Sequence, residues 1–96
     1  MSDVLTAEAA VATERPSRYL TQLCKHFAHK ITSAEFDEQR GDLVFSAGSC
    51  QLTAEEGVLR MVVRAESEEN LERMRQVVAS HLVRFGTRDE LVVEWR

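Results

Sequence analysis

The stretch GVLRMVVRAESEENLERMRQVVASHLVRFG, residues 57–86, decides the fold, because the period of its apolar residues changes partway along it. The first part alternates, which is typical of a half-buried antiparallel strand. Its apolar side consists of Leu59, Met61, Val63 and Ala65. The second part repeats every three or four residues, which predicts an amphipathic helix of about five turns. Its apolar stripe consists of Leu71, Met74, Val77, Val78, Leu82 and Phe85. Ser67 is a good N-cap, and Gly86 is placed to end the helix.

Three shorter alternating segments precede this strand, and turn residues separate them. Ala34 and Phe36 begin the series, Leu43 and Phe45 continue it, and the third segment is Cys50–Ala54. The turns are expected at residues 39–42, 47–49 and 56–57, each of which contains a glycine. Four consecutive strands with short turns predict an antiparallel meander.

A first helix is expected to begin near Pro16, because the fixed φ of proline and its missing N–H suit the first turn. The residues with the spacing of one buried helical face are Leu20, Leu23, Cys24, Phe27, Ala28 and Ile31. The opposite side carries Arg18, Gln22, Lys25, His26 and His29.

Both ends of the chain suggest further strands. Residues 7–13 suit a weak edge strand, residues 91–95 suit a short closing strand, and residues 1–6 are expected to be disordered. The element order is then (β)-α-β-β-β-β-α-β in a single domain of residues 1–96. This order predicts a two-layer α+β sandwich, in which both helices cover one face of a mainly antiparallel sheet. The other face is a candidate for homodimer or partner binding, or is simply solvated; its expected valines are Val44, Val58, Val62 and Val92.

Composition narrows the functional class. The 96 residues are 44% hydrophobic and 29% charged, which is typical of one soluble globular domain. The net charge of −4 argues against nucleic-acid binding driven by overall phosphate attraction. No targeting or membrane-spanning segment is visible, and the two cysteines are too few for a disulfide framework. We therefore expect a cytoplasmic protein with reduced thiols.

The segment LCKHFAHK, residues 23–30, contains a cysteine and two histidines, the ligand types of zinc, copper and iron sites. On a helix Cys24 lies about 160° from His26 and about 140° from His29, so the three cannot close on one ion. His26 and His29 are about 60° apart on the expected exposed side and are the candidate metal ligands. The alternative is that both are solvent-facing and complement the negative end of the helix dipole.

His81 falls at the edge of the apolar stripe of the second helix. We expect it to be partly buried and hydrogen-bonded to the backbone or to a carboxylate. If it lay beside Cys24 or Cys50, the pair could form a weak metal or redox centre, but this spacing is not a recognised motif.

Residues 15–30 form a basic segment within an acidic chain. They carry +4 and no acidic residue, whereas the rest of the chain carries −8. The four cations are Arg15, Arg18, Lys25 and Lys30, which are the candidate contacts for an anionic ligand or an acidic partner. A solvated face, or pairing with the acidic residues 35–38, is the alternative.

The sequence shows none of the residue patterns that are typical of an enzyme active site. All four glycines are expected at turns, so no Gly-rich phosphate loop exists. Neighbouring carboxylates such as Asp37 and Glu38 would point to opposite faces of a strand and could not act together as acid and base. Cys50 is the only candidate nucleophile, and no base is placed for it. We therefore expect a non-enzymatic protein.

The segments ERPSRYLTQLCKHFAHK (residues 14–30), GSCQL (48–52), VVASHLVRF (77–85) and LVVEW (91–95) resemble an uncharacterised bacterial family, domain of unknown function 2218. The resemblance covers the chain from about residue 10 to the end, in the order of the family. It implies a small stand-alone bacterial protein. It also implies a link to iron metabolism, because some family members are joined to, or encoded near, siderophore-interacting flavin reductases. It identifies no catalytic residue.

The expected function is therefore an accessory protein-interaction module in iron or siderophore metabolism, with the basic first helix as its contact surface and a flavin reductase as its partner. The alternative is a metal-binding or small-anion-binding protein that uses the same face.

Overall fold

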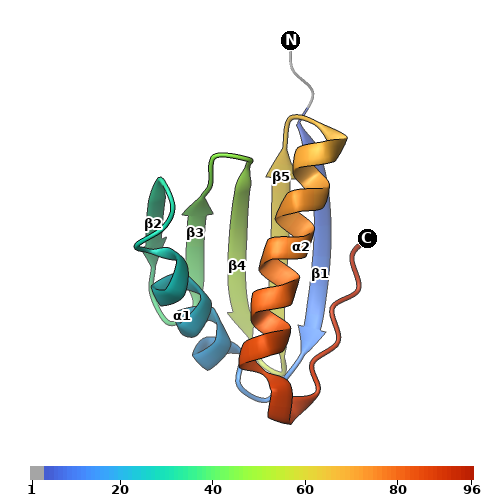
Figure 1. Ribbon diagram of the computed structural model, residues 1–96. Helices are drawn as coiled ribbons and strands as arrows, with labels where there is room; N and C mark the ends of the chain where they lie inside the picture. Colours follow the sequence, from blue (N-terminus) through green and yellow to red (C-terminus); the bar gives the residue numbers. More distant parts are fainter. Residues whose placement is uncertain (1–3) are drawn as a thin grey trace.

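The computed structural model describes residues 4–96 and contains one five-stranded antiparallel sheet with two helices on one of its faces (Figure 1). The strands lie in the order β1-β5-β4-β3-β2, and every neighbouring pair is antiparallel. The elements are β1 Leu5–Ala12, α1 Pro16–Phe27, β2 Ser33–Phe36, β3 Arg40–Val44, β4 Ser49–Glu55, β5 Val58–Ala65, α2 Glu68–Phe85 and the 3-10 helix η1 Thr87–Asp89. The predicted α+β fold is confirmed.

The change in the spacing of apolar residues within 57–86 marks the point where the chain passes from the sheet to the layer of helices. Strand β5 buries every second side chain, and α2 then lies across the sheet face that those side chains occupy. The hydroxyl of Ser67 accepts a hydrogen bond from the backbone N–H of Asn70, as an N-cap should. The core between the layers joins alternating sheet residues to one face of each helix. Its fully buried side chains include Leu20, Leu23, Leu52, Met61, Met74 and Leu82.

The turn between β2 and β3 lies earlier than expected. Residues 40–42 belong to β3, and the chain reverses at residues 37–39. The carboxylate of Asp37 fixes this reversal by accepting hydrogen bonds from the backbone N–H groups of Gln39 (2.7 Å) and Arg40 (2.8 Å). Gly41 is therefore a strand residue. A side chain there would come within 2.7 Å of the Cys24 sulfur, so the glycine lets α1 approach the sheet.

The N-terminal strand is longer than predicted. Strand β1 begins at Leu5, and Leu5 and Thr6 pair with Ala65 and Arg64 of β5, although disorder was expected there. The remainder of that expectation, residues 1–3, lies outside the described residues. Because every second residue of β1 is buried or partly buried, the strand contributes to the core up to its first residue.

The predicted closing strand at residues 91–95 is wrong. After η1 the chain passes through Glu90 in the left-handed region (φ 51°) and runs beside β1 without forming a ladder. The contact is one pair of backbone hydrogen bonds, Glu8 N–H to Arg96 O (3.1 Å) and Arg96 N–H to Glu8 O (2.8 Å). The alternation that suggested a strand is nevertheless real, because Leu91 is buried and Val93 and Trp95 pack on the core. Side-chain burial holds this segment in place.

No helix within residues 4–96 is long and apolar enough to cross a membrane.

The C-terminal segment allows a paired test of core packing. Leu91 is 8% exposed and packs against Gly86, whereas the neighbouring Val92 is 65% exposed. Leu91→Ala should lower the free energy of unfolding by about 2–4 kcal/mol, because it removes a buried side chain and leaves a cavity. Val92→Ala should change it by less than about 0.5 kcal/mol. Urea denaturation of both variants checks this, and equal effects would mean that the segment is not part of the core.

Candidate functional site

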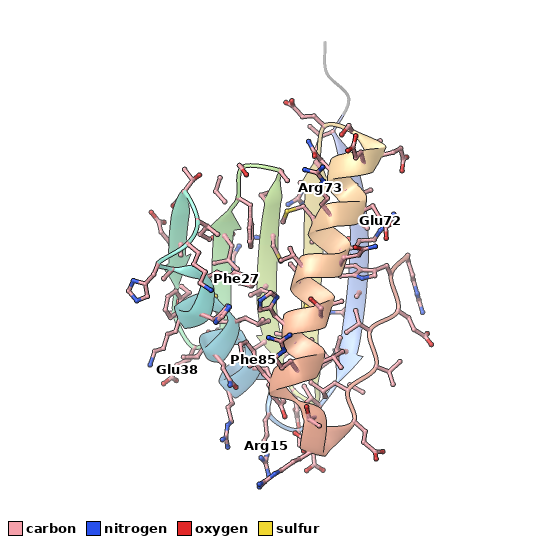
Figure 2. The ribbon with its side chains drawn as sticks, in the orientation of Figure 1. Arg15, Phe27, Glu38, Glu72, Arg73 and Phe85 are labelled. Atoms are coloured by element: carbon pink, nitrogen blue, oxygen red, sulfur yellow. The ribbon has the colours of Figure 1, made fainter. Side chains whose placement is uncertain are left out.

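The two helices meet along a seam filled by aromatic rings from both sides. Phe27 of α1 lies 4.9 Å from His81 of α2 and 5.0 Å from Phe45, measured between ring centres. His26 lies 4.8 Å from His81 and 5.4 Å from Phe85. Figure 2 labels Phe27 and Phe85 on the two sides of this seam. The seam therefore brings together two of the three histidines of the chain.

His26 lies in this seam, which corrects the expectation that it faces solvent. It is partly buried, and its Nε2 atom is buried without a hydrogen-bond partner among the described residues. Burial lowers the pKa of His26, and the nearby charges of Lys30, His81 and Arg84 lower it further. Both effects favour the neutral form of His26.

The sequence contained a weak signal for this position. His26 lies only about 90° from the centre of the buried face of α1, and Tyr19 lies on the same flank seven residues earlier. A flank of this kind is buried only if a second element lies beside the helix. The position of α2 therefore decides the exposure of His26.

His81 occupies the predicted kind of position. It is partly buried, and its Nδ1 lies 2.6 Å from the backbone oxygen of Val77. Because a carbonyl oxygen can only accept, Nδ1 must carry the proton and donate it. In the neutral ring Nε2 is then the free acceptor.

His29 lies apart from this pair. Helix α1 ends at Phe27, and His29 is exposed in the turn at residues 28–30. The helical face that was predicted to hold His26 and His29 together therefore ends before His29. Within residues 4–96 no group of three or more His, Cys, Asp or Glu side chains is arranged to hold a metal ion.

Both cysteines are free and buried in the core. Burial raises the pKa of Cys24 to about 12, with a smaller contribution from Asp42. Burial also raises the pKa of Cys50, and the neighbouring Cys24 adds to this. Since only the thiolate is a good nucleophile, neither sulfur is prepared for catalysis at neutral pH.

The four predicted cations are joined by two more from the other side of the seam. Arg15, Arg18, Lys25 and Lys30 are exposed along and just beyond α1. Arg84, in the last turn of α2, acts on the same histidine as Lys30, and Arg88 of η1 lines a hollow with Arg15 and Arg18. We call these six residues the basic surface: Arg15, Arg18, Lys25, Lys30, Arg84 and Arg88. Figure 2 labels Arg15 at the lower end of α1, near η1.

None of these six cations forms an ion pair within residues 4–96. The ion pairs there join Arg60 to Glu55, Arg73 to Glu69 and Arg75 to Glu72. The predicted alternative, pairing of the basic helix with residues 35–38, is therefore not observed in this part of the chain. The charge of the basic surface remains available to a ligand.

A hollow of about 330 Å³ lies within the basic surface, between the start of α1 and η1. Arg15, Arg18 and Arg88 line it together with Tyr19, Gln22, Phe85, Thr87 and Asp89. The hydroxyl of Tyr19 donates a hydrogen bond to Asp89, and this bond raises the pKa of Tyr19, with burial adding to the effect. The carboxylate of Asp89, which accepts this hydrogen bond, thus lines the same hollow as the three arginines.

The open face of the sheet is largely polar. Val58 and Val62 are partly buried there, and Val44 is 42% exposed, among charged neighbours such as Arg60 and Arg64. Val92, which was also expected on this face, is 65% exposed on the C-terminal segment, which forms no strand. The described residues of this face therefore form no continuous apolar patch.

The buried thiols give the first test of the site. In the native protein at pH 8, both cysteines should react with a thiol reagent such as dithionitrobenzoate only as fast as the fold opens, because they are buried and protonated. In denaturant two thiols should react within the mixing time. Rapid labelling of Cys24 in the native state would contradict this assignment.

The thiols also predict a pH dependence of stability. The pKa of Cys24 is about 12 in the folded state, against 9.0 for an unperturbed thiol. Between these values the unfolded chain loses its proton first, so the free energy of unfolding should fall as the pH rises from 9 towards 12. Chemical denaturation at several pH values checks this. Cys24→Ala should make this decline less steep. An unchanged slope would mean that the Cys24 thiol does not cause the decline.

Comparison with known proteins agrees with this fold. No curated protein matches the chain. The NMR structure of PA4090 from Pseudomonas aeruginosa is similar, with 32% sequence identity and a TM-score of 0.79, over 100% of this chain and 96% of that one. The family described as "Uncharacterized protein conserved in bacteria (DUF2218)" matches residues 8–96. The chain belongs to this uncharacterised bacterial family.

Proposed function

We propose that this chain is a non-enzymatic accessory module that binds an acidic segment of a partner protein through the basic surface. The observation that carries the proposal is the gathering of six cationic side chains, from α1 and its two ends, from the last turn of α2 and from η1, none of which has an ion-pair partner within residues 4–96. Such a group repels itself, and an acidic partner relieves that repulsion.

The charge distribution supports a directed encounter. The chain as a whole carries −4, so an acidic partner is repelled by most of its surface and attracted to one side. Long-range attraction of this kind raises association rates and weakens with salt, because the Debye length is about 8 Å at physiological ionic strength. Three arginines around one hollow also suit the planar carboxylates of Asp and Glu, which arginine binds in a bidentate manner.

The chemistry of the seam supports a binding role over a catalytic one. The thiols are buried and protonated, and Nδ1 of His81 is committed to the Val77 carbonyl. The carboxylate of Asp89 accepts a hydrogen bond from Tyr19. The thiols and His81 thus offer no activated nucleophile, and the nearby hollow is lined by arginines that can donate hydrogen bonds to an anion.

The family suggests the first partner to test. Because the resemblance described above links this family to siderophore-interacting flavin reductases, we propose such a reductase as the partner. The proposal places the pair in the bacterial cytoplasm, in iron metabolism.

Titration of a purified siderophore-interacting flavin reductase into the labelled protein should shift the amide signals of residues 15–30 and 84–88. The double variant Arg18→Glu/Lys25→Glu should weaken binding by at least about tenfold, which corresponds to about 1.4 kcal/mol. Both residues are exposed and without ion pairs, so the fold should not change. Calorimetry at two salt concentrations measures the affinity.

The matched control is Arg40→Glu/Arg64→Glu, which makes the same change of charge on the open face of the sheet, at two exposed residues without ion pairs. It should bind nearly as well as the parent protein. If both double variants lost the same affinity, the loss would follow from net charge alone, and the proposal that the partner binds the basic surface would be wrong. Absence of binding would exclude the reductase as the partner. Shifts that a small dicarboxylate alone reproduces would favour a small-anion site in the hollow instead.

A further inference from the structure

The two imidazoles of the seam are arranged in a way that the basic surface does not explain. His26 and His81 come from different helices, and their ring centres lie 4.8 Å apart with the ring planes inclined by 44°. A nitrogen atom of one of them, Nε2 of His26, is buried without any partner among the described residues. An unpaired buried polar atom costs about 1–3 kcal/mol, so a ligand that satisfied it would be stabilised by the fold.

The orientation of His81 is that of a metal-binding histidine. Its Nδ1–H donates to the Val77 carbonyl oxygen at 2.6 Å, which fixes the ring and leaves the lone pair on Nε2. Metal-ligating histidines usually donate their second nitrogen to a backbone carbonyl or a carboxylate in this manner. Val77 lies four residues earlier on the same helix, so the support is built into α2.

The spacing of the rings fits a shared ion. Zinc–nitrogen bonds are about 2.0–2.1 Å long, and two imidazoles on a tetrahedral ion then have their centres about 5 Å apart. The observed separation is 4.8 Å. Phe27 and Phe85 flank the rings and restrict their movement, with Phe27 4.9 Å from His81 and Phe85 5.4 Å from His26.

We propose that His26 and His81 are the two protein ligands of a transition-metal site, which binds Zn(II) or Cu(I) through Nε2 of each ring. No third His, Cys, Asp or Glu within residues 4–96 completes the set, so water or an exogenous ligand must supply the remaining positions.

The neighbouring cations decide what fills the open positions. Lys30 and Arg84 lie close enough to His26 to act on its charge. They oppose a bare divalent ion, but they attract an anion bound to that ion. The site is thus suited to a metal that carries an anionic third ligand, such as a carboxylate or hydroxide.

The test uses untagged protein, because a histidine tag would bind the same metals. Zn(II) chloride and, under anaerobic conditions, Cu(I) are titrated separately while the imidazole nitrogens are observed by NMR. At least one ion should bind saturably with one ion per chain and shift Nε2 of both His26 and His81. His26→Phe and His81→Phe keep a ring in the seam but remove the ligand nitrogens. Each should weaken binding by at least about tenfold, since loss even of a supporting group costs 10–100-fold.

His29→Ala is the matched control, because His29 is exposed outside α1 and should leave binding unchanged. Amide spectra of the two phenylalanine variants verify that the seam is still folded. No saturable binding of either ion would overturn the proposal. Binding that survives both phenylalanine variants, or that is lost in His29→Ala or Cys24→Ala, would overturn it as well.

Discussion

The contact between α1 and α2 is the interaction on which the rest of the structure depends. Both helices lie on the same face of the sheet, so each buries one stripe against the strands and one flank against the other helix. Phe27 occupies the centre of that contact, with His26, His81 and Phe45 around it. The contact determines which polar groups lose water, and therefore where chemistry or binding can occur.

The same contact assembles the basic surface. His26 of α1 meets His81 of α2, and Tyr19, earlier on α1, meets Asp89 of η1, so the helices run in opposite directions. The start of α1 therefore lies beside the end of α2, and Arg15 and Arg18 approach Arg88. The C-terminal end of α2 carries partial negative charge, which favours Arg84 there, whereas Arg15 and Arg18 lie at the positive end of α1. The positive charge of this end of the surface is therefore only partly offset.

Sequence periodicity predicted those elements whose position follows from local chemistry. Ser67 and Gly86 bounded α2 as expected, and Pro16 began α1. Periodicity failed where two signals compete. Gly41 suggested a turn, but Asp37 makes the turn through its side chain, and the glycine serves the approach of α1 instead. The alternation of residues 91–95 suggested a strand, yet it reflects only which side chains are buried.

The sequence by itself determined the two-layer α+β fold, the cations of α1 and the burial of Cys24, because these follow from repeats along one element. It also indicated a partly buried His81 with a backbone partner. Only the tertiary structure decided that His26 faces His81 and that Arg84 and Arg88 extend the basic surface. A helical period specifies which residues share a face. It contains no information about which neighbouring element will cover the flank, since that depends on contacts between residues more than fifty positions apart.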